Sequence, residues 1–325
     1  MRISVALCTY NGTRFLKRQL ASLLTQTRQP DELIVCDDCS SDGTVQVLMD
    51  FQKQASFPVK IQINVLNVGP AKNFEQAIAL CTGDLISLCD QDDVWLPNKL
   101  EVAERYFIQF PSMDAVFSDG LVVDATLELI GYKLWDHVGF NAEERRMMQQ
   151  QRGLEVLLKH VVVTGATLSI RARLRERIFP IPTSWMHDAW IALMAASSSA
   201  LGAVEEPLFL YRQHEANQIG ARQRSLTTLC KEALRINREG YYAVDVMRYR
   251  EALTRLNQFS TEIRPDAIEL MNAKLNHLEI RSSLPATRIL RLPGILVELV
   301  SHGYRRYSVG WEVAIKDFLL RAESR

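Results

Sequence analysis

The sequence predicts an α/β protein in which a mostly parallel sheet carries helices on both faces and is followed by a helical region. Short β-rich apolar runs alternate with amphipathic stretches of helical period over the first hundred residues, as in right-handed βαβ units. From about residue 225 onward the pattern is helical and charged. With 325 residues, of which 47% are hydrophobic, the chain is long enough for one large domain or two smaller ones.

The elements of the first hundred residues are expected to alternate regularly. Apolar runs predict strands at 3–10, 32–37, 59–65 and 83–90. The stretches between them predict helices at 11–27, 40–54 and 69–81. In the first of these helices, leucines recur on one face at helical spacing, at Leu16, Leu20, Leu23 and Leu24.

The rest of the chain is less regular. Strand-like runs are expected at 115–119, 121–123, 161–170 and 207–214. A loop that enters a helix is expected at 135–151, and another helix is expected to begin near His187. We predict one domain over 1–220, with halves at 1–100 and 101–220, and a helical C-terminal region over 221–325.

The charge is unevenly distributed along the chain. The formal net charge is zero, so nothing in the overall charge points to a nucleic-acid partner. Residues 1–120 carry 10 basic and 15 acidic residues, a net charge of −5, whereas residues 221–325 carry 18 and 12, a net charge of +6. The two ends are therefore expected to meet different surroundings.

Several features predict a cytoplasmic protein. The first apolar run gives way to polar residues too soon for an export signal, and no run of about 18 apolar residues predicts a membrane-spanning helix. Most cysteines stand in apolar runs, which favours buried reduced thiols. Cys36 and Cys39 form a C-x-x-C pair, but no second pair follows, so a zinc or redox site is not expected.

Polar side chains stand at the carboxyl end of each of the first four predicted strands. They form the groups Thr9-Tyr10-Asn11, Asp37-Asp38, Asn67-Val68-Gly69 and Asp90-Gln91-Asp92. Each group alone is typical of a turn, but ligands of open α/β sheets bind beyond the carboxyl ends of the strands. Four such groups at one sheet edge therefore favour a binding site.

The last group places carboxylates close together. Asp90, Asp92 and Asp93 repel one another unless they lie in solvent or hold a cation. In an extended chain Asp90 and Asp92 point to the same side, and paired carboxylates suit Mg²⁺ or Mn²⁺ bound together with substrate phosphates. Asp93 is expected to hold the turn or to orient its neighbours. Neither a G-x-x-x-x-G-K-[ST] nor a G-x-G-x-x-G motif is present, which argues against a P-loop enzyme and against a dinucleotide dehydrogenase.

Seven segments give the chain a resemblance to family 2 glycosyltransferases with the GT-A fold. They are CTYNG at 8–12, SLLTQTRQPDELIVCDDCSSDGT at 22–44, NVGPAKNFEQA at 67–77, GDLISLCDQDDVWLPNKL at 83–100, GATLSI at 165–170, WMHDAW at 185–190 and EPLFLYRQHEAN at 206–217. They cover roughly the first 220 residues in the family's order. Within the family the chain most resembles the rhamnosyltransferase-like enzymes of bacterial surface polysaccharides, such as the O-antigen of lipopolysaccharide.

The resemblance implies roles for individual residues. The donor nucleotide is expected to contact Thr9, Tyr10, Asn11, Asp38, Lys72 and Asp90. The metal of the family's D-x-D element is expected on Asp92, with Asp90 and His214 as further ligands. Asp188 stands where the family keeps its catalytic base. Weaker candidates for contact with a sugar or the acceptor are Trp95, Trp185 and Trp190.

Each of these residues also has a plainer interpretation. Asp188 begins an apparent helix, where aspartate is favoured for capping. His214 can be a surface histidine, and Lys72 can be a solvated helix residue. The tryptophans can belong to the core, because large aromatic side chains are commonly buried.

The resemblance also implies a reaction. It is the inverting transfer of one sugar, with Mg²⁺ or Mn²⁺, from dTDP-rhamnose or a UDP-hexose to a hydroxyl of a glycan or lipid-linked glycan. The first 100 residues would bind the nucleotide, and residues 101–220 the acceptor. The Q-x-x-R-W element of the family's processive polymerases is absent, which favours a single addition. Two alternatives remain, namely an inactive nucleotide-sugar-binding module and a metal-dependent nucleotidyltransferase or phosphohydrolase.

Residues 286–306 combine an apolar cluster with flanking arginines. This pattern is typical of a segment that lies on an anionic membrane surface, here the inner face of the membrane. Pro293-Gly294 predicts a break into two short helices. The alternative is a helix packed on the catalytic domain or on a partner subunit.

Overall fold

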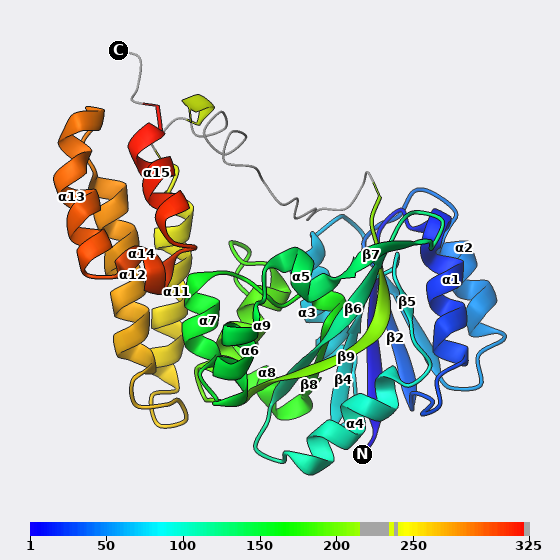
Figure 1. Ribbon diagram of the computed structural model, residues 1–325. Coiled ribbons are helices and arrows are strands. Elements are labelled where there is room, and N and C mark those ends of the chain that lie inside the picture. The colour runs from blue at the N-terminus through cyan, green and yellow to red at the C-terminus, as the bar shows by residue number, and fades with distance from the viewer. Residues whose placement is uncertain (215–233, 237–239, 322–325) are drawn as a thin grey trace. The chain divides into compact units, whose positions relative to one another are not determined.

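The computed structural model describes residues 1–214, 234–236 and 240–321 (Figure 1). The remaining positions of the predicted helical region, and the end of the segment at 206–217, lie outside the described residues. Over the part of the chain that is described, no helix is both long and apolar enough to cross a membrane. The chain forms two compact units, one from residues 1–151 and 162–214 and the other from residues 152–161 and the described residues after 233.

The first unit is built on one sheet. Among the described residues its strands take the order β3-β2-β1-β4-β8-β6-β9-β5, with β7 paired to β6. Their bounds are β1 Ile3–Thr9, β2 Glu32–Asp37, β3 Val59–Ile63, β4 Leu85–Cys89, β5 Val94–Trp95, β6 Ala115–Val123, β7 Leu129–Lys133, β8 Leu168–Arg171 and β9 Leu201–Arg212. Strands β1 to β4 run parallel, whereas β8 is antiparallel to both β4 and β6. The sheet is therefore more mixed than predicted.

Helices cover both faces of this sheet. They are α1 Thr13–Leu24, α2 Thr44–Gln52, α3 Pro70–Leu80, α4 Lys99–Gln109, α5 Leu134–Val138, α6 Ala142–Gln149, α8 Arg175–Ile178 and α9 His187–Ala196. Every residue of β1 is buried. On one face Val5 and Leu7 share a core cluster with Leu16 and Leu20 of α1, while α3 packs on β1 from the other face. Burial on both faces explains the continuous apolar runs of the sequence.

Three predicted elements of the middle differ in the structure. Residues 115–119 and 121–123 form the single strand β6, because the carboxylate of Asp119 accepts hydrogen bonds from the Gly120 and Trp135 amides and can stay buried. Of the predicted strand at 161–170, only its last residues form a strand, β8, after a short 3-10 turn. The predicted loop before the helix α6 holds a further short helix, α5.

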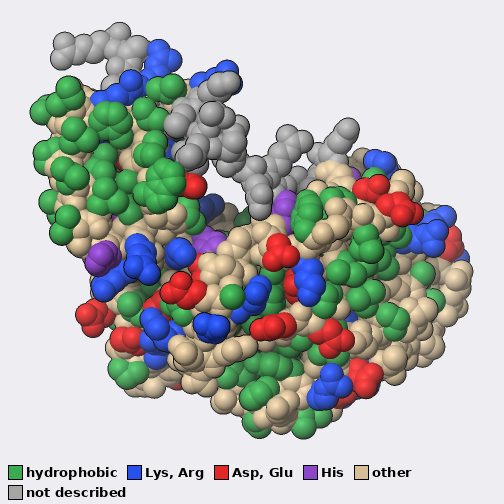
Figure 2. Space-filling model, in the orientation of Figure 1, with side chains coloured by type: hydrophobic (Ala, Val, Ile, Leu, Met, Phe, Trp, Pro, Cys, Tyr) green, Lys and Arg blue, Asp and Glu red, His purple; other side chains and the backbone are tan. Residues whose placement is uncertain are grey.

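The second unit is helical. Its elements are α7 Gly153–Lys159, α11 Ala243–Gln258, α12 Ala267–Ser283, α13 Arg288–Val300, α14 Gly303–Tyr307 and α15 Trp311–Leu319. The predicted break at Pro293-Gly294 is wrong, because α13 continues through Pro293. Proline leaves the carbonyl of Ile289 without its helical partner, but Ile289 is 71% exposed and water can satisfy it. Apolar side chains gather on the surface around α13 (Figure 2).

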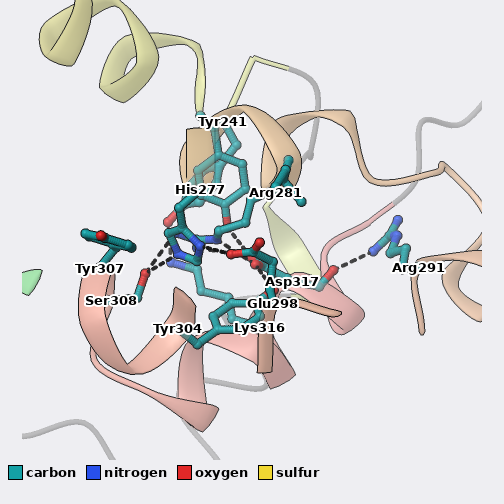
Figure 3. Close-up of polar contacts among 12 residues, drawn as sticks. Tyr241, His277, Arg281, Arg291, Glu298, Tyr304, Tyr307, Ser308, Lys316 and Asp317 are labelled. Atoms are coloured by element: carbon teal, nitrogen blue, oxygen red, sulfur yellow. Dashed lines mark hydrogen bonds and ion pairs between the residues drawn. The ribbon is translucent and has the colours of Figure 1, made fainter. Parts of the chain in front are cut away.

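A buried polar network joins the helices of this unit (Figure 3). Its centre is Asp317 of α15, which is fully buried. Asp317 accepts hydrogen bonds from Arg281 Nε at 2.7 Å, from the Tyr304 hydroxyl at 2.7 Å and from the Tyr242 hydroxyl. Such a charge is stable inside a protein only while its partners are in place.

We expect Asp317→Asn to destabilise the second unit by about 3–5 kcal/mol, because Arg281 then lies buried without its counter-ion. Hydrogen exchange of α12 and α15 in urea would measure the change. The matched control is Glu279→Gln, which removes an ion pair with Arg250 whose side chains are 43% and 63% exposed. The control should cost less than about 1 kcal/mol. Equal losses in the two variants would contradict a structural role of the network.

Candidate active site

A cavity of about 760 Å³ opens in the first unit beyond the carboxyl ends of β1, β2 and β4. Its walls come from segments that are far apart in the sequence, within 8–15, 67–74, 90–93, 164–165, 186–188 and 211–214. Eight of the predicted site residues line it, namely Thr9, Tyr10, Asn11, Asp38, Asp90, Asp92, Asp188 and His214. The sequence placed the first six at the ends of parallel strands, and the fold brings them to one edge.

Gln91 ties the loop after β4 to the loop after β1. Its Oε1 accepts a hydrogen bond from the Tyr10 amide at 2.8 Å, and its Nε2 donates to the Tyr10 carbonyl at 2.9 Å. A Cβ on Gly12 would lie 2.1 Å from Gln91 Oε1, so only glycine allows this approach. Gln91 therefore fixes its neighbours Asp90 and Asp92 beside the start of α1.

Asp38 holds the rim of the cavity. Its carboxylate accepts hydrogen bonds from the Val68 amide at 2.8 Å, the Gly69 amide at 2.9 Å and Asn64 Nδ2 at 2.9 Å. Gly69 has φ +82°, a conformation that favours glycine. These bonds use three of about four acceptor positions on the carboxylate, so one remains for a ligand. The predicted base contact of Asp38 stays a prediction.

The end of β9 is packed against the loop after β4. His214 Nε2 lies 2.9 Å from Asp92 Oδ2, and the imidazole packs on the Phe15 ring with 4.6 Å between the ring centroids. The guanidinium of Arg212 lies 4.6 Å from the centroid of the same ring. Phe15 thus supports both residues, and Asp92 and His214 meet although 122 positions separate them.

Asp93 anchors this arrangement. It is buried, and its Oδ1 accepts a hydrogen bond from the Arg212 amide at 3.1 Å. Arg212 Nε donates in turn to the Asp92 carbonyl at 2.7 Å. Burial and the nearby charges of Asp92 and Asp90 raise the pKa of Asp93 well above its usual value. The geometry agrees with the predicted role of Asp93 in orienting its neighbours.

The carboxylates around the cavity fit a divalent cation. Burial and the charges of Asp92 and Asp188 raise the pKa of Asp90 to about 8, so a bound cation would favour the ionised form of its carboxyl group. Hard oxygen ligands of this kind suit Mg²⁺ or Mn²⁺. Among the residues described, no three acidic, histidine or cysteine side chains already form a metal cluster. A cation on Asp92, with Asp90 and His214 near it, would therefore take its other ligands from a diphosphate and water.

Asp188 lies at the start of α9, where it is buried. Its Oδ2 accepts a hydrogen bond from the Gly165 amide at 3.0 Å, and its Oδ1 accepts one from the Ala189 amide at 2.7 Å. The N-cap of α9 is Met186, so Asp188 is an acidic residue of the first turn and not its cap. The two hydrogen bonds hold the carboxylate at the wall of the cavity near Asp90, as a general base requires.

His187 is a cavity residue that the sequence analysis missed. Only 4% of it is exposed, and its ring stacks on Phe74 with 3.9 Å between the centroids. Within the described part of the chain, neither ring nitrogen has a hydrogen-bond partner. Burial lowers its pKa, so the imidazole is neutral and can bind a hydroxyl of a ligand. Its position directly before Asp188 is the sequence feature that could have identified it as a cavity residue.

Four predicted site residues are not part of the cavity lining. Lys72 forms an ion pair with Glu75 at 2.8 Å. Trp95 and Trp190 are 2% and 1% exposed, and Trp185 packs on Trp190 with 5.7 Å between the ring centroids. The structure thus places the three rings in the interior, where large aromatic surfaces gain most from burial.

Comparison with known proteins decides the family. Residues 4–167, about half of the chain, match the family model described as glycosyl transferase family 2. The chain belongs to glycosyl transferase family 2. The cavity of this glycosyltransferase is formed largely by that matched region, which contains Asp90 and Asp92, whereas Asp188 and His214 follow it.

Two relatives illustrate the similarity. An uncharacterized glycosyltransferase of Nostoc sp. is 29% identical over 228 residues, which cover 67% of this chain and 66% of that protein. A UDP-Glc:α-D-GlcNAc-diphosphoundecaprenol β-1,3-glucosyltransferase of Escherichia coli is 33% identical over 100 residues, which cover 31% and 38%. The chain therefore spans less than two thirds of the length of either relative.

Solved structures share the fold of this glycosyltransferase. TarS 1–349 of S. aureus, in complex with UDP-GlcNAc, has a TM-score of 0.55 and 17% identity over 98% of this chain and 90% of that one. The mannosyltransferase PcManGT from Pyrobaculum calidifontis, in complex with GDP-Man and Mn²⁺, has a TM-score of 0.52 and 17% identity over 98% and 85%. The predicted α/β fold with a helical region after the sheet is thereby confirmed.

Proposed function

We propose that this glycosyltransferase moves one sugar from a nucleoside-diphosphate donor to a hydroxyl of a glycan or lipid-linked glycan, with inversion at the anomeric carbon. The observation that carries the proposal is the meeting of Asp90, Asp92 and Asp188 at one cavity. The E. coli relative is named for a diphosphoundecaprenol-linked acceptor, which supports an acceptor of this class. Such an acceptor would place the enzyme at the cytoplasmic face of a membrane.

Each residue has a distinct task in this proposal. Asp188 accepts the proton of the acceptor hydroxyl, because the Gly165 and Ala189 amides hold its carboxylate at the cavity wall. With Asp188 as the single base, the hydroxyl attacks the anomeric carbon directly and the configuration inverts. Asp92, with Asp90 and His214, would hold the cation, which would offset the charge of the departing diphosphate.

The donor nucleotide lies at the start of α1 in this proposal. Thr9, Tyr10 and Asn11 line the cavity there, and Asp38 at its rim faces the base. The proposed donors are dTDP-rhamnose and UDP-hexoses. The complexes of the two structural neighbours, with UDP-GlcNAc and GDP-Man, support a nucleoside-diphosphate sugar as the donor class.

A thermal-shift screen tests the proposal. Candidate donors are dTDP-rhamnose, UDP-glucose, UDP-GlcNAc and GDP-mannose, each with and without Mn²⁺. We expect one donor to raise the melting temperature only when Mn²⁺ is present, because a ligand of the folded state stabilises it. Incubation of that donor with a lipid-linked glycan should then release nucleoside diphosphate.

The products also distinguish the alternatives. Release of pyrophosphate or nucleoside monophosphate would point to a nucleotidyltransferase or phosphohydrolase. Donor binding without release of any nucleotide, over a panel of acceptors, would point to an inactive nucleotide-sugar-binding module.

A further inference from the structure

Helix α13 has an inverted distribution of side chains. Apart from Arg288 at its start, its charged residues are Arg291 and Glu298, which are buried, at 0% and 6% exposure. Its outward face is apolar, with exposed side chains at Ile289, Leu290, Leu292, Leu296, Val297, Leu299 and Val300. Figure 2 shows the resulting apolar surface. A surface helix of a water-soluble protein normally buries its apolar side chains and exposes its charged ones.

Arg291 is held inward by backbone carbonyls. Its Nη1 donates to the carbonyls of Asp317, Phe318 and Leu320 at 2.8 to 3.0 Å. The other guanidinium nitrogens donate to Pro285 and Ala286, both at 2.8 Å. The side chain thus ties α13 to the end of α15, where Figure 3 shows its bond to the Asp317 backbone, and to the loop before α13.

Glu298 is held inward by a second contact. Its Oε2 bonds to His277 Nδ1 of α12, and His277 Nε2 lies 3.0 Å from the hydroxyl of Ser308. Rotation of α13 to bury its apolar face would break the bonds of both Glu298 and Arg291 and leave buried partners unpaired, which is costly. The network therefore keeps the apolar face directed outward.

We infer that this outward face of α13 is a docking surface for an anionic lipid bilayer. Arg288 lies exposed at the start of the helix, and Arg305 and Arg306 lie exposed just after its end. The only acidic residue of α13 is Glu298, which is buried. Apolar side chains between cationic ends match the acyl region and the anionic headgroups of such a membrane. The purpose of membrane docking rests on the proposed function, because a lipid-linked acceptor lies in a membrane.

Vesicle flotation of the full chain tests this surface without donor, acceptor or transfer. The probes are vesicles of phosphatidylcholine alone and of phosphatidylcholine with about one third phosphatidylglycerol. We expect the protein to bind the anionic vesicles at least about tenfold more strongly than the neutral ones. The variant Leu292→Ser/Leu296→Ser should lose about tenfold or more in binding. Arg305→Glu/Arg306→Glu should lose the preference for anionic lipid.

The matched control replaces exposed apolar residues of the first unit. Ile108 and Leu129 are 64% and 66% exposed, and Ile108→Ser/Leu129→Ser should bind vesicles like the wild type. Circular dichroism of each variant verifies its fold.

Failure of the wild type to float, or equal flotation of Leu292→Ser/Leu296→Ser, would overturn the inference. A dimer that this variant abolishes, without vesicle binding, would assign the face to a second copy of the chain. Vesicle binding in an enzyme that transfers no sugar would contradict only the proposed function.

Discussion

Asp188→Asn should lower the rate of sugar transfer by about 10²–10⁴-fold while donor binding changes little. The amide has the shape of the carboxylate and can still accept a hydrogen bond from the Gly165 amide, so the start of α9 should stay in place. It cannot accept a proton from the attacking hydroxyl, and the reaction loses its base. The release of nucleoside diphosphate measures the rate, and the thermal shift with donor and Mn²⁺ measures binding.

The matched control for this change is Asp50→Asn. Asp50 lies exposed on α2 and pairs with Lys53 at 3.0 Å, outside the cavity lining. Its amide variant should transfer sugar at the wild-type rate. If Asp188→Asn kept its transfer rate, Asp188 would have only a structural role in the first turn of α9, and the base would have to be another group.

The first half of the sheet could be predicted from the sequence because its signals are local. Each strand of β1 to β4 is a short apolar run, and each ends in polar residues that the parallel arrangement brings to one edge. The order of strands and helices along the chain is therefore enough to assign Asp90 and Asp38 to one site. The alternation of strand and helix sets this geometry without long-range information.

Other features depend on contacts that no local pattern reveals. The antiparallel strand β8 pairs with β4, about 80 positions earlier in the chain, and with β6, more than 50 positions earlier. Trp95 and Trp190 were candidates for sugar contact because aromatic side chains occur both in hydrophobic cores and in sugar-binding sites. Only their packing in the structure shows that both belong to the core. His187 was missed because its importance rests on burial and on unpaired ring nitrogens. Pro293 predicted a helix break, but the carbonyl that it leaves unpaired, at Ile289, can bind water, and the helix continues.

Asp92→Asn should remove the effect of Mn²⁺ on donor binding and lower sugar transfer by at least about 10²-fold. The Asp92 carboxylate lies against His214 at the cavity, and a neutral amide is a much weaker ligand for a hard cation. The fold should persist, because the loop stays fixed by Gln91 and by the bond from Arg212 Nε to the backbone carbonyl of residue 92. Thermal shift with donor, titrated with Mn²⁺, measures the loss.

Two further substitutions separate metal binding from the position of the loop. Asp93→Ala should chiefly lower stability, because it removes the buried acceptor of the Arg212 amide at the end of β9. Asp136→Asn, at an exposed residue outside the cavity lining, should leave stability and the Mn²⁺ response unchanged. If Asp92→Asn still responded to Mn²⁺ like Asp136→Asn, the cation would have to bind elsewhere. The repulsion that raises the pKa of Asp90 would then have to be offset by another positive charge, such as a cationic side chain.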